Sequence, residues 1–79
     1  MATLAQNFKL LADLHEDTAV LIQSALRLID DNTNTKVTLK NLNKEKKTVD
    51  FVIEAGSIND LKQACDYKGI TIKGSTLSV

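Results

Sequence analysis

The sequence predicts a small α+β domain: a long N-terminal amphipathic helix, followed by a small antiparallel sheet that carries one short helix. Residues 1–31 contain neither glycine nor proline, and their apolar residues recur at helical spacing. Residues 36–79 instead contain short runs in which apolar and polar residues alternate, separated by turn-forming residues. The 79 residues suffice for one domain. We therefore expect a single domain over residues 1–79, with a ββαβ half over 36–79 and the order α-β-β-α-β.

The N-terminal segment has a clear helix start and a periodic face. Thr3 and Gln6 have the form of a capping box, with a hydroxyl at the N-cap and an amide three residues later. From there to Asp31, good helix formers dominate. One column follows the alternating four-three spacing of a helix-pairing seam. This seam consists of Leu4, Phe8, Leu11, His15, Thr18, Ile22, Ala25 and Ile29.

The length of this helix suggests self-association. About 29 helical residues extend about 43 Å at 1.5 Å each, whereas a compact domain of this size is only about 30 Å across. Part of the apolar face would remain in water unless a second copy covered it, and two-fold homodimers are the commonest oligomers. The alternative is a break at residues 15–17, where Asp17 would cap a second helix and two short helices would fold over the sheet of a monomer. We favour one helix because the break contains no glycine, proline or asparagine.

The second half begins with two strands. Residues 36–40 alternate lysine or threonine with Val37 and Leu39, which is typical of a strand with one apolar face. Residues 43–46 indicate a hairpin loop. In residues 48–54, one apolar residue in every two again marks an inward face. These residues therefore predict a β-hairpin.

The remaining residues predict a helix and a third strand. Residues 57–60 resemble a helix start with serine at the N-cap, and Gly69 is a plausible residue to follow the helix end. Ile70 and Ile72 indicate a strand. A turn at residues 74–75 would return the last apolar residues to the inner side as a fourth short strand.

Few residues suggest chemistry. Cys65 is the only cysteine and His15 the only histidine, which excludes an internal disulfide and a His/Cys metal cluster. We predict Cys65 to be a small core residue and His15 to be structural. Asp13, Glu16 and Asp17 could hold a cation from one helix, but a solvated acidic face explains them as well. We expect no enzyme, no catalytic residue, no metal and no cofactor.

Residues 69–76 resemble a phosphate loop, with two glycines at the required spacing followed by serine and threonine. The lysine that should follow the second glycine is missing, and the intervening residues alternate like a strand. We therefore expect no nucleotide site at residues 69–76.

The charge is unevenly distributed although the net charge is zero. Residues 1–35 carry an acidic excess and residues 36–79 a lysine excess. Five lysines fall on the predicted hairpin and could contact nucleic acid or an acidic partner. They are Lys36, Lys40, Lys44, Lys46 and Lys47. Against nucleic acid, no arginine accompanies them, and lysines also protect edge strands from unwanted pairing.

These observations favour a non-enzymatic interaction or assembly protein, such as a subunit, adaptor or inhibitor, that forms a homodimer or larger homo-oligomer through its N-terminal helix. The alternative is a small nucleic-acid-binding regulator that uses the lysine hairpin. No apolar run is long enough to span a bilayer, so we expect no membrane partner. The first residues lack a signal-peptide pattern and the lone thiol fits a reducing compartment, which predicts a cytoplasmic location.

Overall fold

The computed structural model describes residues 3–79 and confirms the predicted α+β class, including the fourth strand. The seven elements occur in the order α1 (Leu4–Leu11), α2 (Glu16–Asn32), β1 (Lys36–Asn43), β2 (Thr48–Ala55), α3 (Ile58–Lys68), β3 (Thr71–Lys73) and β4 (Thr76–Ser78).

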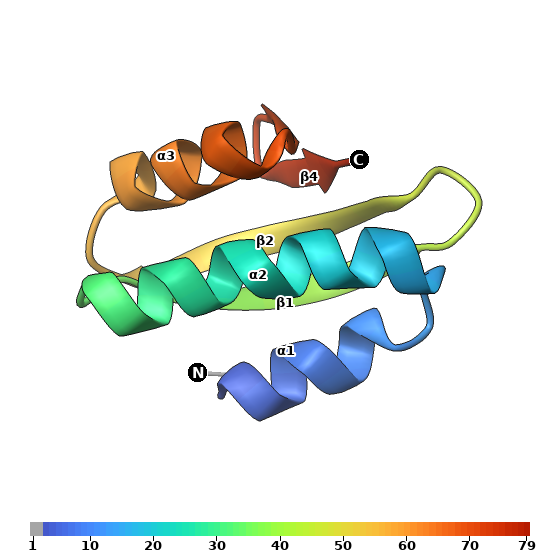
Figure 1. The fold of residues 1–79 in the computed structure, drawn as a ribbon, viewed down its shortest axis with the longest axis horizontal. Helices are drawn as coiled ribbons and strands as arrows, with labels where there is room; N and C mark the ends of the chain where they lie inside the picture. The colour runs from blue at the N-terminus through green and yellow to red at the C-terminus, as the bar shows by residue number, and fades with distance from the viewer. Residues whose placement is uncertain (1–2) are drawn as a thin grey trace.

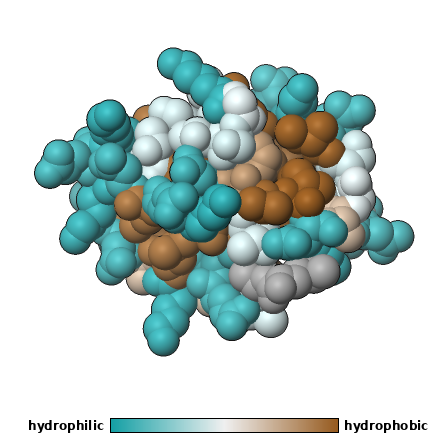
Figure 2. All heavy atoms as spheres, turned by 180° about the vertical axis from the view of Figure 1, so that it is seen from behind, coloured by the Kyte–Doolittle hydropathy of each residue, from teal (hydrophilic) through white to brown (hydrophobic). Residues whose placement is uncertain are grey.

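The molecule has two layers. All neighbouring strands are antiparallel, in the order β1-β2-β4-β3. Figure 1 shows α2 crossing in front of β1 and β2, with α1 below it and α3 above it. Figure 2 shows the opposite side, where the sheet lies: hydrophilic side chains project around the border, and two apolar areas are separated by polar groups. The sheet is therefore covered by helices on one face.

The prediction of one continuous N-terminal helix is wrong, because the chain turns between α1 and α2. His15 is the N-cap of α2, and its Nδ1 accepts a hydrogen bond from the backbone N–H of Asp17 at 3.3 Å. The carboxylates of Glu16 and Asp17 lie in the first helical turn, where they favour the positive end of the helix dipole. These local signals start a second helix without any glycine or proline.

The overhang that suggested self-association is also absent. The 17 residues of α2 extend about 25 Å, and the longest dimension of the molecule is 30 Å. The core draws on all three helices and on the sheet: Leu11, Ile22, Val49, Leu61 and Leu77 are each fully buried. The broken helix therefore fits within its own domain.

A buried threonine joins the two connections at one end of the sheet. Thr35, which is 2% exposed, precedes β1; its hydroxyl donates to Oδ2 of Asp60 at 2.6 Å and accepts from the N–H of Ser57 at 3.0 Å. Gly56 has φ +90°, and a Cβ there would overlap Oγ1 of Thr35. Glycine is required at this position by its backbone angle and by the close approach of Thr35.

Candidate functional site

The predicted self-association seam lies mostly inside the chain. His15 is exposed at the start of α2, whereas the rest of the seam faces the core. Leu11, Thr18, Ile22, Ala25 and Ile29 are buried, and Leu4 and Phe8 are half-buried. The guanidinium of Arg27 lies 5.0 Å from the centre of the Phe8 ring, which adds cover from α2. The excess apolar surface that motivated a helix-paired dimer is therefore covered by the chain itself.

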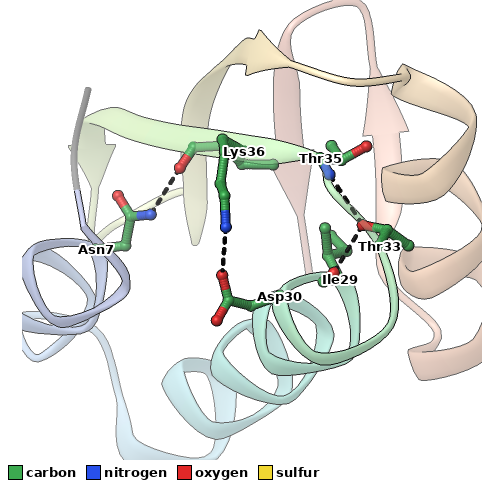
Figure 3. Close-up of polar contacts among 7 residues, drawn as sticks. Asn7, Ile29, Asp30, Thr33, Thr35 and Lys36 are labelled. Carbon is green, nitrogen blue, oxygen red and sulfur yellow. Dashed lines mark hydrogen bonds and ion pairs between the residues drawn. The ribbon is translucent and has the colours of Figure 1, made fainter.

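A buried asparagine attaches α1 to the edge of the sheet. Asn7 is 3% exposed; its Nδ2 donates to the carbonyl of Val37 at 2.8 Å and its Oδ1 accepts from the N–H of Leu39 at 3.0 Å. Figure 3 shows this side chain pointing from α1 to β1. Asn7 pairs with the strand as a residue of a neighbouring strand would. Nothing in the sequence pattern distinguished it from a polar residue on the helix surface.

A hollow of about 330 Å³ lies beside this attachment, between α1, α2 and β1. Its walls include the apolar side chains of Leu26 and Ile29. At its border, Nζ of Lys36 lies 3.1 Å from Oδ1 of Asp30. Figure 3 shows the two side chains pointing toward one another. Lys36, predicted to contact an acidic partner, is thus paired within the chain. The volume is at the lower end of the range for ligand pockets, about 300–1,000 Å³.

The other hairpin lysines are exposed, and the sheet brings a further lysine to them. Lys40 pairs in register with Asp50, Asp50 with Thr76, and Thr76 with Lys73. The four residues therefore form one row across the sheet, and Lys73 joins the lysines of the hairpin despite its distance in sequence. Exposed lysines at 40, 44, 46, 47 and 73 make up this lysine surface. Within residues 3–79, the ion pairs are Lys36–Asp30 and His15–Asp17, so none of these five lysines forms one.

A carboxylate lies in the middle of this row. Oδ1 of Asp50 accepts from the hydroxyl of Thr76 at 2.6 Å, and Oδ2 accepts from Nδ2 of Asn41 at 3.3 Å. These two hydrogen bonds, with a smaller contribution from the charge of Lys40, hold the pKa of Asp50 below its usual value. Asp50 therefore stays ionised and offsets part of the positive charge around it.

Helix α3 carries the most exposed large apolar side chain among residues 3–79. Tyr67 is 79% exposed and Ile58 is 38% exposed. Since nine residues at 100° each amount to two and a half turns, the two lie on opposite flanks of the helix. Tyr67 borders a hollow of about 280 Å³ against α2, and Ile58 borders one of about 530 Å³ against β3. Tyr67, Ile58 and the two hollows together make up the α3 surface. Sequence reasoning missed it, because the helical spacing of Ile58 with Leu61 and Cys65 indicated a shared apolar face, and Tyr67 follows no pattern that marks exposure.

The residues that could carry chemistry lie either in the core or at the solvated surface. Cys65 is 1% exposed, and burial raises its pKa to about 11, which confirms the predicted core position. Asp13, Glu16 and Asp17 are exposed. No group of three or more histidine, cysteine, aspartate or glutamate side chains suited to a metal ion occurs in residues 3–79.

The segment that resembles a phosphate loop is a β-hairpin. Gly69 adopts the left-handed conformation with φ +76° and ends α3, as predicted. The following residues form β3 and β4, joined by the expected turn at residues 74–75. No helix follows the second glycine within the described chain, so the backbone N–H groups that would hold a phosphate are not assembled here.

The longest helix, α2, has 17 residues. None of the helices in residues 3–79 has the length and apolar character needed to cross a membrane.

The α3 surface, the lysine surface and the hollow beside α1 are the features from which a function has to be inferred. Comparisons with protein-family models, with curated proteins and with solved structures found no match to this chain.

Proposed function

We propose that the protein is a non-enzymatic module that binds another protein through α3. The observation that carries the proposal is the exposure of Tyr67 and Ile58 on opposite flanks of this helix, each beside a hollow. Tyrosine contributes a large, rigid contact area and is enriched among the residues that dominate binding energy. The hollows offer places for apolar side chains of the partner.

The surroundings of Tyr67 support a protein partner in particular. The hollow beside it is lined by Leu28 and Ala64, with the amides of Asn32 and Gln63 also lining it. An apolar floor with polar groups around it is the usual composition of a protein interface. The Lys68 ammonium lies 5.3 Å from the centre of the Tyr67 ring and leaves most of the ring exposed. A partner that covered this ring would remove a large apolar area from water.

The test compares two aspartate substitutions of exposed apolar residues. Tyr67→Asp alters the proposed surface, and Val20→Asp alters a position on α2 that is 50% exposed. Each protein is immobilised, incubated with an extract of the native host, and its bound proteins are quantified by mass spectrometry. We expect a partner that wild type and Val20→Asp retain equally and that Tyr67→Asp retains about tenfold less. Circular dichroism confirms that both variants are folded. Equal retention of every bound protein by Tyr67→Asp would contradict the proposal.

A nucleic-acid-binding function is a second candidate. It is favoured by the register that adds Lys73 to the lysines of the β1–β2 hairpin, which gives five lysines without an ion pair within residues 3–79. Phosphate contacts of this kind make binding weaken steeply with salt. The triple variant Lys44→Glu, Lys46→Glu, Lys47→Glu should then lose retention on single-stranded DNA and RNA, while Lys9→Glu on α1 should not. Unchanged retention by the triple variant removes this candidate.

A further inference from the structure

The two edges of the sheet differ in whether a side chain of the protein pairs with the edge strand. At the β1 edge, Asn7 occupies the carbonyl of Val37 and the N–H of Leu39. Side-chain pairing of this kind prevents another strand from adding there. At the opposite edge, β3 is the last strand of the sheet and has one strand neighbour, β4. The β3 edge therefore presents a position where a further strand could pair, whereas Asn7 already occupies part of the β1 edge.

The register shows which backbone groups face outward from β3. The carbonyl of Ser75 accepts from Phe51 at 2.8 Å and the N–H of Val79 donates to Lys47 at 3.4 Å, so alternate residues of β4 bond to β2. Leu77 lies between them and shares their direction. Because Ile72 is opposite Leu77 in the β3–β4 pair, its N–H and C=O point away from β4. Ile72 thus offers one donor and one acceptor to an added strand.

A hollow with an apolar wall of isoleucines lies beside this edge. The hollow of about 530 Å³ is lined by Ile58 from α3, by Ile70 just before β3 and by Ile72 within β3. Ile72 is half-buried and packs against the core, so its side chain lies on the helix side of the sheet. A strand paired with Ile72 would therefore direct every second side chain towards Ile58.

The charges near this edge indicate which side chains a bound segment would carry besides the apolar one. Lys62 lines the hollow, and Lys73 follows Ile72 on the outward face of β3. Neither lysine has an ion pair within residues 3–79. Asp66 is the one acidic residue in the lining. Lys62 and Asp66 contribute opposite charges to the lining, so the unbalanced positive charge is that of Lys73, and it favours acidic side chains on the outward face of an added strand.

We propose that an extended segment of a partner protein, with alternating apolar and acidic residues, adds to β3 as a fifth strand. Its backbone pairs with the N–H and C=O of Ile72, one apolar side chain enters the hollow at Ile58, and the acidic side chains, on the opposite face of the added strand, lie near Lys73. This mode is β-strand addition, in which backbone bonds supply affinity and side-chain pockets supply specificity. The inference rests on the proposed protein-binding function and names the kind of segment that is bound.

The experiment uses a fluorescent peptide of about seven residues in which glutamate and isoleucine alternate. Anisotropy measures its affinity for the whole chain, and amide NMR locates the contact. We expect chemical-shift changes centred on Ile72 and slower hydrogen exchange of its N–H. Ile58→Lys places a charge at the hollow and should weaken binding about tenfold, whereas Val20→Lys on α2 should leave it unchanged. Ile58 is 38% exposed, so the substitution is compatible with folding.

A charge-reversed variant tests recognition without touching the hollow's apolar wall. Lys73→Glu should weaken binding of the glutamate peptide and strengthen binding of a peptide in which lysine replaces glutamate. Shift changes confined to other elements, equal affinity for both peptides, dimerisation of the chain through β3, or binding of DNA oligonucleotides alone would each overturn strand addition.

The two proposals fail separately. If the partner captured from the host extract depends on Tyr67 but no peptide binds at Ile72, the protein-binding function stands and strand addition is wrong. If the peptide binds at Ile72 and no captured protein depends on Tyr67, the edge is the binding site and the proposed role of the α3 surface is wrong.

Discussion

Replacing Asn7 with alanine tests how α1 is held to the sheet. The substitution removes two buried hydrogen bonds and leaves the carbonyl of Val37 and the N–H of Leu39 without their partner. Each of the two buried groups left unsatisfied costs about 1–3 kcal/mol, so we expect Asn7→Ala to lower the free energy of unfolding by about 2–6 kcal/mol. That is a large part of the stability of a small domain, which is on the order of 5 kcal/mol.

The assay is urea unfolding followed by circular dichroism, with hydrogen exchange of the Leu39 amide as a local readout. Lys9→Ala is the matched control, since Lys9 is exposed on the same helix and should change stability by less than about 0.5 kcal/mol. Asn7→Asp keeps the acceptor for Leu39 but places a carboxylate against the carbonyl of Val37, so it should destabilise the fold as well. An Asn7→Ala variant as stable as Lys9→Ala, with an equally protected Leu39 amide, would refute the reasoning.

Three further predictions concern Gly56, Asp50 and Cys65. Gly56→Ala should lower the free energy of unfolding, measured in urea, by more than about 2 kcal/mol, because a Cβ would overlap Thr35. Gly74 has φ +59° but open space around it, so Gly74→Ala should lower that free energy by only about 1 kcal/mol. Equal losses in the two variants would contradict this account. The pKa of Asp50 is lower in the folded chain than in the unfolded chain, so the unfolded chain binds the proton more readily. The ionised Asp50 side chain therefore stabilises the fold fully above the ordinary carboxyl pKa, and this stabilisation is lost as the pH falls through the pKa of the folded state. The urea midpoint of Asp50→Asn should therefore fall less on acidification than that of the wild type, and parallel pH profiles would show that Asp50 is not responsible. The Cys65 thiol, buried and with a pKa of about 11, should react with a disulfide reagent much more slowly in buffer than in urea, and equal rates would place it at the surface.

The candidate sites differ in how far the sequence could anticipate them. The hairpin lysines were predicted because five lysines within a short segment are visible in any reading of the chain. That Lys36 is paired with Asp30, and that Lys73 lies in the row of Lys40, follows from contacts between elements that are distant in sequence. The exposure of Tyr67 depends equally on how α3 is placed against α2.

The sequence by itself determined the local events: the capping box at Thr3, the serine N-cap at Ser57, the left-handed helix end at Gly69 and the alternation of the strands. Each is set by a side chain and the backbone within a few residues of it, so a short window contains the whole cause. The local signals at His15, Glu16 and Asp17 permit a second helix to start, but only the tertiary structure decided that the first helix breaks there, that the seam faces inward and that Asn7 pairs with the β1 edge. The break lets the apolar faces of both helices be buried within one small domain, and that gain comes from contacts across the chain that no local pattern records.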